Sequence, residues 1–134
     1  MSNRKLRFAL FGVGDFGPYF APYIVEVADL VAICDPNPGA RTRFFKMTGL
    51  QLLEFDNHEK LLAGVDIDAV AITSPNFTHK EIAVAAARAG KHIYCEKAMA
   101  NTVPDCWEMV RECETAGVRL MVGHKRRLRP PWAR

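Results

Sequence analysis

The sequence predicts an α/β fold: a doubly wound, mostly parallel six-stranded sheet with helices on both faces. Two observations support it. Short apolar runs alternate with longer amphipathic stretches along all 134 residues, and this alternation is typical of βαβ units with right-handed crossovers. The apolar runs are also nearly continuous, as expected of parallel strands that are buried on both faces. The length suits one domain with a single core.

Strands are predicted, in chain order, at residues 6–11, 30–34, 51–55, 69–73, 92–95 and 119–122. Helices are predicted between them at residues 16–28, 38–47, 57–63, 77–89 and 103–116. Gly90 and Gly117 mark the ends of the last two helices, and Thr102 is a suitable N-cap for the last one. Pro22 lacks an N–H, so we expect it to kink the first helix or leave its first turn irregular.

Composition excludes several classes of protein. Hydrophobic residues make up 49% and charged residues 25%, which is ordinary for a soluble globular protein. No apolar run reaches the roughly 20 residues of a membrane span, so no membrane partner is expected. The net charge of +3 arises at the end of the chain, because residues 1–124 carry 13 basic and 15 acidic groups. A nucleic-acid partner is not expected either, since such proteins spread basic groups over one face.

The cysteines indicate a reduced protein without a metal site. Cys34, Cys95, Cys106 and Cys113 form no C-x-x-C pair and no spacing typical of metal ligands. The basic start is followed by an apolar stretch that Arg7 and then glycines interrupt, which predicts a strand rather than a signal peptide. We therefore expect a cytoplasmic location.

A glycine-rich loop follows the first strand directly and opens the first helix. It contains Gly12, Gly14, Asp15, Phe16 and Gly17 in a G-x-G-x-x-G pattern. In a Rossmann fold the first glycine allows the tight turn, the second lets the backbone approach a pyrophosphate, and the third permits close helix–strand packing. The loop thus predicts a dinucleotide site; the alternative is a glycine-rich turn that binds nothing.

Asp35 ends the second strand, 18 residues after Gly17. A dinucleotide site places there the carboxylate that accepts hydrogen bonds from the adenosine ribose. A carboxylate would also repel a 2′-phosphate, so NAD is favoured over NADP, although Arg41 and Arg43 are near enough in sequence to soften this preference. Asp35 also begins the turn Asp-Pro-Asn-Pro-Gly, and both roles are compatible.

Three further segments, together with the glycine loop, resemble the Gfo/Idh/MocA family (glucose–fructose oxidoreductase, inositol dehydrogenase and relatives). They are Thr-Ser-Pro-Asn-Phe-Thr-His at residues 73–79, the pair Glu96-Lys97, and Val-Gly-His-Lys-Arg-Arg-Leu-Arg-Pro at residues 122–130. The resemblance runs from about residue 5 to the end. Ala98 departs from it, because the family has a proline there after a peptide bond that is often cis; for a non-proline residue the cis form costs about 2.5–4 kcal/mol.

The resemblance also implies roles for individual residues. The cofactor cleft would be lined by Ser74, Pro75, Asn76 and His79. Glu96 would lie beside the nicotinamide ribose. Lys97 would be catalytic, holding a substrate hydroxyl and sharing in the movement of its proton. The residues themselves leave alternatives open: Glu96-Lys97 as a solvated ion pair, and His79 as a residue that satisfies backbone groups.

The predicted function follows from these assignments. Residues 1–134 would form the NAD(P)-binding domain of an oxidoreductase that transfers a hydride between nicotinamide and a sugar, inositol or similar polyol. The family's substrate domain lies outside this chain, so we expect the chain alone to be inactive and the full-length enzyme to be a homo-oligomer. The alternative is a standalone NAD-sensing or interaction module without turnover. A methyltransferase-type Rossmann domain would explain the glycine loop and Asp35 but not Glu96-Lys97.

Overall fold

The computed structural model describes residues 4–128. Its six strands form one sheet in the order β3-β2-β1-β4-β5-β6, and each neighbouring pair is parallel. The strands are β1 Arg7–Phe11, β2 Asp29–Cys34, β3 Leu53–Phe55, β4 Ala69–Ile72, β5 His92–Cys95 and β6 Leu120–Val122. The predicted doubly wound sheet is confirmed, with the strand order reversing between β1 and β4.

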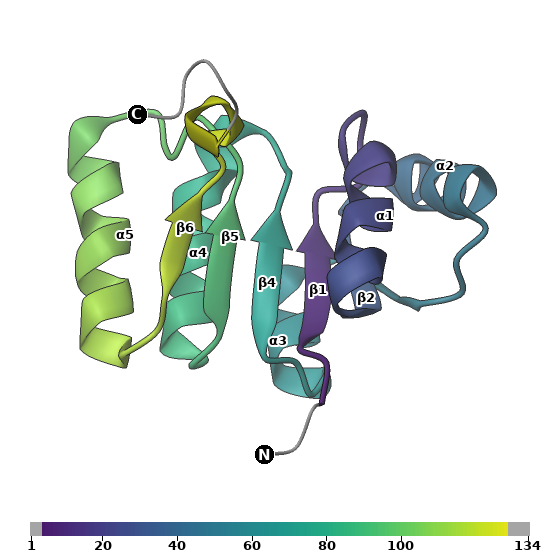
Figure 1. Cartoon of the computed structure of the whole chain (residues 1–134), viewed down its shortest axis with the longest axis horizontal. Helices are drawn as coiled ribbons and strands as arrows, with labels where there is room; N and C mark the ends of the chain where they lie inside the picture. Colours follow the sequence, from purple (N-terminus) through teal and green to yellow (C-terminus); the bar gives the residue numbers. More distant parts are fainter. Residues whose placement is uncertain (1–3, 129–134) are drawn as a thin grey trace.

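The helices cover the two faces of this sheet (Figure 1). They are α1 Gly17–Val27, α2 Pro38–Thr48, α3 His58–Gly64, α4 His79–Arg88 and α5 Val103–Ala116, with short 3₁₀ helices η1 Asn76–Thr78 and η2 Lys125–Leu128. One hydrophobic cluster joins the sheet to α3, α4 and α5, and a second joins it to α1 and α2. None of the helices within residues 4–128 is long and apolar enough to cross a membrane.

Successive strand residues belong to opposite clusters, which explains the continuous apolar runs. In β4, Val70 and Ile72 belong to the cluster with α4, whereas Ala71 between them belongs to the cluster with α1. All three side chains are at most 1% exposed. A central strand must therefore be apolar at every position, because side chains alternate between two covered faces.

Three helices begin later than predicted: α1 at Gly17 and α3 at His58, each by one residue, and α4 by two. α4 begins at His79 rather than Phe77, because the residues before it form η1. α1 continues through Pro22 without a break. Its first turn is tightened, since the carbonyl of Phe16 accepts from Tyr19 N at 3.0 Å as well as from Phe20 N at 3.1 Å.

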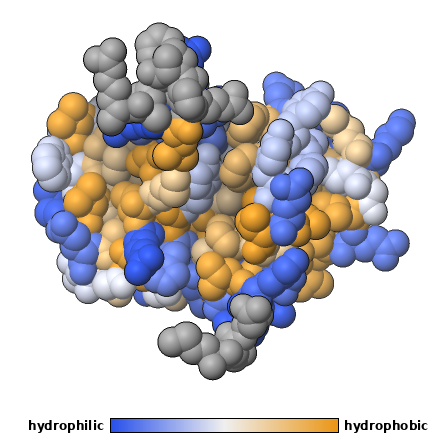
Figure 2. All heavy atoms as spheres, viewed as in Figure 1, coloured by the Kyte–Doolittle hydropathy of each residue, from blue (hydrophilic) through white to orange (hydrophobic). Residues whose placement is uncertain are grey.

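The sheet face that carries α1 is open over β5 and β6, where none of the described helices covers it (Figure 1). Tyr94 and Met121 are register partners on these two strands. Tyr94 packs against the α1 cluster, and Met121 is 52% exposed. Hydrophobic residues are prominent on this side of the molecule (Figure 2).

Candidate functional site

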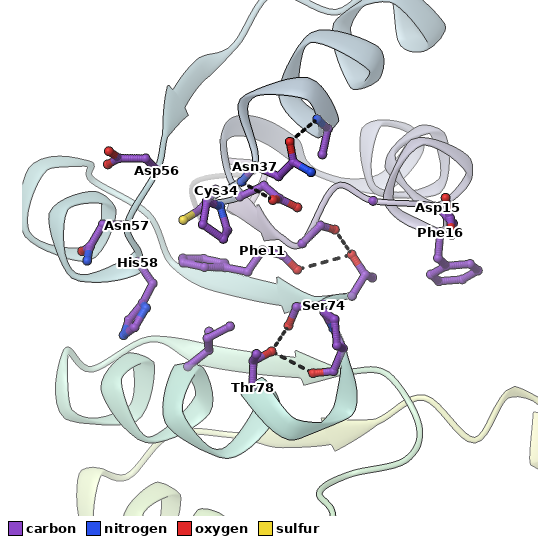
Figure 3. A pocket seen from close by; sticks show the side chains of 18 of the residues that line it. Phe11, Asp15, Phe16, Cys34, Asn37, Asp56, Asn57, His58, Ser74 and Thr78 are labelled. Atoms are coloured by element: carbon purple, nitrogen blue, oxygen red, sulfur yellow. Dashed lines mark hydrogen bonds between the residues drawn. The ribbon is translucent and has the colours of Figure 1, made fainter.

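A cavity of about 980 Å³ lies at the carboxyl ends of the strands, beside the point where their order reverses. Open α/β sheets bind ligands at this place. Figure 3 shows an elongated space, with His58 at one end, Phe16 at the other, and Ser74 and Asn37 on opposite walls. Its walls thus come from four separate segments of the chain, which follow β1, β2, β3 and β4.

The three glycines of the loop have three different surroundings. Gly12 has φ +85°, and a Cβ there would collide with the backbone of Ser74. A Cβ on Gly17 would lie 2.7 Å from the carbonyl oxygen of Gly12. Gly14, by contrast, has no other group within 4 Å of its would-be Cβ. The outer two glycines therefore allow close packing within the protein, while the middle one leaves free space beside the backbone.

The start of α1 adds the positive end of a helix dipole to the cavity. No side chain caps its N-terminus, whereas Asn37 caps α2. Asp15 and Phe16, just before α1, line the cavity. Tyr19 N and Phe20 N already donate to the Phe16 carbonyl and Pro18 has no N–H, so the positive end of the helix dipole is what suits an anion such as a pyrophosphate there.

Asp35 connects the glycine loop to the turn after β2. Its Oδ2 accepts from Val13 N and its Oδ1 from Asn37 N, both at 2.9 Å. A carboxylate has about four acceptor positions, so two bonds leave capacity for ribose hydroxyls on the side that lines the cavity. The structure therefore gives Asp35 its turn role and leaves it available for a ligand.

The two arginines near Asp35 differ in their availability. Arg41 donates to the carbonyl of Asp35 at 2.6 Å and to Glu54 at 3.0 Å. Arg43 lines the cavity and pairs with Asp15 at 2.9 Å. Both partners of this second pair are largely exposed, and such pairs contribute little to stability. Arg43 is thus the arginine that can reorient toward a bound ligand.

The segment after β4 forms the wall opposite the turn after β2. Thr73 Oγ1 donates to the carbonyl of Gly12 at 2.6 Å, and Ser74 Oγ lies 2.6 Å from Thr78 Oγ1. Ser74 and Pro75 line the cavity, as does Phe77, which is 73% exposed. Asn76 does not line it. Sequence reasoning missed Phe77; an aromatic residue in a Pro-Asn-Phe-Thr turn was the available signal.

His79 does not lie where the sequence analysis expected it. Its side chain is fully buried and is not part of the cavity wall. Nδ1 lies 2.8 Å from the carbonyl oxygen of Ala98, and Nε2 lies 2.8 Å from that of Ser74. It therefore contacts backbone groups beneath the cavity, because α4 turns it inward toward the β5 side of the sheet. This is the alternative role that the sequence left open.

Glu96 and Lys97 follow β5, the strand next to β4, and lie outside the cavity wall. Glu96 Oε1 accepts from the Tyr94 hydroxyl at 2.8 Å, and Oε2 accepts from Lys97 N at 3.3 Å. The Lys97 side chain is exposed, and the Lys97–Ala98 peptide bond is cis. The structure thus holds Glu96 in place and leaves the Lys97 ammonium free to meet a ligand.

Tyr94 is a site residue that sequence reasoning missed. Its ring stacks on Phe20 with centroids 5.1 Å apart, and Phe20 stacks on Phe16 at 5.6 Å. Burial and the hydrogen bond to Glu96 raise the pKa of Tyr94 well above its usual value, so its hydroxyl remains a donor. These three aromatic rings connect the glycine loop to Glu96. The period-two spacing of Tyr94 and Glu96 was the available signal, since such residues lie on one face of a strand.

Gly123 completes this side of the site. Its N–H donates to the carbonyl of Cys95 at 2.8 Å. A Cβ on Gly123 would collide with the Tyr94 hydroxyl and lie 2.9 Å from Glu96 Oε1. The segment after β6 therefore passes so close to Tyr94 and Glu96 that any side chain at position 123 would displace their polar ends.

Cys34 and Cys95 are buried thiols at the ends of β2 and β5. Burial raises the pKa of both Cys34 and Cys95 to about 12, so both remain protonated thiols rather than nucleophilic thiolates. No group of three or more metal-ligating side chains was found among the described residues.

A glycine turn that opens a helix, an acidic residue after β2 and a cavity at the reversal of strand order together define a dinucleotide-binding Rossmann domain. Comparison with known families agrees with this geometry. The model of the Gfo/Idh/MocA family, described as an oxidoreductase family with an NAD-binding Rossmann fold, matches residues 6–124. The chain belongs to this family and is its NAD-binding domain.

Individual relatives differ in their names. The chain is 32% identical over 121 residues to 2,7-anhydro-N-acetylneuraminate hydratase of Escherichia coli, covering 89% of this chain and 32% of that protein. It is 37% identical over 130 residues to inositol 2-dehydrogenase of Rhizobium meliloti, covering 93% and 38%. This chain thus spans about a third of the length of these relatives.

Among solved structures, the WlbA dehydrogenase from Bordetella pertussis in complex with NADH and UDP-GlcNAcA is similar, with a TM-score of 0.86 and 36% identity. The match covers 96% of this chain and 39% of that one. The fold and the cofactor class are therefore shared with a dehydrogenase whose structure contains NADH.

Proposed function

We propose that this domain binds NAD(H) along the cavity and that, within a larger enzyme, it serves hydride transfer between the nicotinamide and a sugar- or inositol-type hydroxyl. The observation that carries the proposal is the placement of two sets of residues. Gly14, Asp35 and Ser74 line the cavity. The pair Glu96-Lys97 follows β5, which lies beside β4, the strand that leads to Ser74.

In this assignment the pyrophosphate lies against the uncapped start of α1 and the free space beside Gly14. The adenosine ribose lies at Asp35, which keeps acceptor positions free. Asp35 also places negative charge where NADP would carry its 2′-phosphate, which supports a preference for NAD over NADP. Arg43, at the cavity edge, limits how large that preference becomes.

When bound, NAD supplies the hydride acceptor. The chain's own contribution is to orient the substrate hydroxyl and to help move its proton. Lys97, exposed after β5, holds this hydroxyl through its ammonium group. It shares the movement of the hydroxyl proton with groups outside this chain. Glu96, held by the Tyr94 hydroxyl, provides a fixed acceptor beside the ribose of the nicotinamide half.

The name of one relative favours a second candidate reaction. The similar protein from Escherichia coli is called a hydratase, and hydration changes no net oxidation state. An enzyme containing this domain would then use its cofactor without accumulating reduced NAD. Following NADH formation alongside product formation in the longer enzyme separates the two candidates, since only a dehydrogenase forms them in equal amounts.

A substrate domain and a homo-oligomeric assembly belong to this proposal as well. The open apolar face over β5 and β6, with Met121 at 52% exposure, supports a further layer of protein there, because monomeric proteins rarely leave such faces bare. Without groups that position a substrate, which can contribute about 7–11 kcal/mol to barrier lowering, we expect the chain alone to show no turnover with polyols.

The test of cofactor binding is a matched pair of glycine substitutions. Gly14→Val fills the space assigned to the pyrophosphate, and the structure has no protein group there to clash with it. Gly64→Val is the control, because Gly64 is equally open and ends α3 outside the cavity wall. We expect NADH binding, measured by calorimetry, to be lost in Gly14→Val and retained in Gly64→Val. Unchanged binding in Gly14→Val would show that the loop is not the site.

A further inference from the structure

His79 is the one fully buried polar residue in the part of the chain that the structure describes. It opens α4, and both of its ring nitrogens have a close oxygen neighbour. Nδ1 lies 2.8 Å from the carbonyl oxygen of Ala98, and Nε2 lies 2.8 Å from that of Ser74. A residue so placed needs a hydrogen-bonding explanation, because an unpaired buried polar group is costly.

The ring lies between two backbone oxygens. A carbonyl oxygen only accepts hydrogen bonds, so a ring nitrogen that carries a hydrogen donates it to the carbonyl beside it; which nitrogen carries it is set by the tautomer. The Cys95 thiol is the other titratable group in contact, 3.3 Å from Nδ1. Burial raises the pKa of Cys95 to about 12, so it remains an S–H group packed against the ring.

The two carbonyls belong to the two segments that build the site. The Ser74 segment packs on the glycine turn, since Thr73 Oγ1 donates to the Gly12 carbonyl at 2.6 Å. Ala98 directly follows Lys97 in the other segment, after β5. His79 therefore connects the cavity wall to the segment that carries the proposed catalytic lysine, and its own side chain reaches neither the cavity nor the surface.

We propose that His79 is a positioning residue whose buried ring, held between the carbonyls of Ser74 and Ala98, fixes the segment at Ser74 and the segment at Lys97–Ala98 relative to each other. The bridge is a property of the cofactor-free chain. Its effect on NADH binding rests on the proposed function.

Two substitutions each retain one of the two contacts that His79 makes with the Ser74 and Ala98 carbonyls. In His79→Asn, the side-chain amide nitrogen takes the position of Nδ1 and keeps the contact with Ala98. In His79→Gln, the side-chain amide nitrogen takes the position of Nε2 and keeps the contact with Ser74. His79→Phe retains the ring shape and removes both contacts. The control is His92→Gln. His92 is an exposed histidine that begins β5.

The first measurement is nuclear magnetic resonance of the cofactor-free chain. We expect a ring N–H resonance from His79 that exchanges slowly with water, because the ring is fully buried between the two carbonyls. The backbone amide signals should shift in a crossed pattern: around Ser74 in His79→Asn, and around Ala98 in His79→Gln. A general loss of packing would instead move both segments in both variants, so the crossed pattern separates positioning from a merely structural role.

The second measurement is NADH affinity. We expect a loss of about tenfold in each one-sided variant and about a hundredfold in His79→Phe, with His92→Gln unchanged; tenfold corresponds to about 1.4 kcal/mol. Uncrossed amide shifts would overturn the proposal, and so would wild-type NADH affinity in the one-sided variants. These two variants keep the test valid if His79→Phe does not fold. If the wild-type chain fails to bind NADH yet the two variants show the crossed shifts, the bridge stands and the proposed function fails.

Discussion

Asp35→Asn separates the two roles of this carboxylate, because the substitution preserves shape and removes charge. In the native protein, Oδ1 and Oδ2 each accept one backbone N–H at 2.9 Å, from Asn37 and Val13. An asparagine side chain has one oxygen, so one of the two N–H groups loses its acceptor and faces an NH₂ group. The bond to Val13 is partly buried and the bond to Asn37 is exposed, so the remaining oxygen should keep Val13 N while Asn37 N bonds to water. We expect the free energy of unfolding to fall by about 0.5–1.5 kcal/mol, the net value of one hydrogen bond.

The same substitution should change cofactor preference. Replacing a charged acceptor with a neutral one weakens its bonds to the ribose hydroxyls, so we expect NADH affinity to fall about tenfold, equivalent to about 1.4 kcal/mol. NADPH affinity should rise or stay constant, because repulsion of the 2′-phosphate is removed. The ratio of the two affinities is therefore the sensitive quantity.

Calorimetric titration of both cofactors and chemical denaturation measure these effects. Asp29→Asn is the matched control: it lies on the same strand at the far end, is exposed, and keeps the backbone N–H that bonds to Leu6. An unchanged NADH-to-NADPH ratio in Asp35→Asn would refute the role of Asp35 as selector. Equal affinities of the wild-type chain for the two cofactors would refute it as well.

Three further predictions concern other parts of the chain. Tyr94→Phe removes the hydroxyl that donates to Glu96, so we expect the free energy of unfolding to fall by about 1 kcal/mol. The ratio of NADH affinity to NADPH affinity should not change. An altered ratio would contradict the assignment of Asp35 to the adenosine ribose and Glu96 to the nicotinamide ribose. The hydrogen bond from the Arg7 backbone N–H, and to a lesser extent the Arg4 side chain, lowers the pKa of Asp68. The ionised Asp68 therefore stabilises the fold at pH values above the pKa it has in the unfolded chain. This stabilisation disappears as the pH falls through the pKa of Asp68 in the folded protein. Asp68→Asn should therefore be less stable than wild type at pH 7 in thermal melts, with the difference narrowing in acid; a constant difference would contradict this. In the longer enzyme, Lys97→Ala should reduce kcat by several orders of magnitude in steady-state kinetics, and full activity would remove Lys97 from the mechanism.

Local patterns were sufficient for most of the secondary structure. The glycine loop, the Asp-Pro-Asn-Pro-Gly turn and the capping residue Thr102 act within a few residues of themselves, so their conformations follow from their own chemistry. Thr102 does accept from Asp105 N, and Gly117 does adopt a positive φ of 67°. The boundary at Phe77 was wrong, because η1 and α4 share one continuous helical pattern and only the backbone geometry divides them.

Residues that act across the sheet were harder to place. Phe16, Phe20 and Tyr94 stack together, although the first and last are far apart in sequence. Their contact depends on which face of the sheet α1 covers, and a sequence pattern does not specify this for a strand that is buried on both sides.

The sequence by itself determined the fold class, a doubly wound sheet built from right-handed crossovers, and the positions of the glycine loop, Asp35 and Lys97 at strand ends. These follow from periodicity and from the short range of turn chemistry. Only the tertiary structure decided that His79 turns inward to Ser74 and Ala98, that Arg43 rather than Arg41 remains at the cavity edge, and that Tyr94 holds Glu96. Each of these outcomes depends on the packing of elements far apart in the chain, because a side chain's partners are determined by the neighbouring elements that surround it.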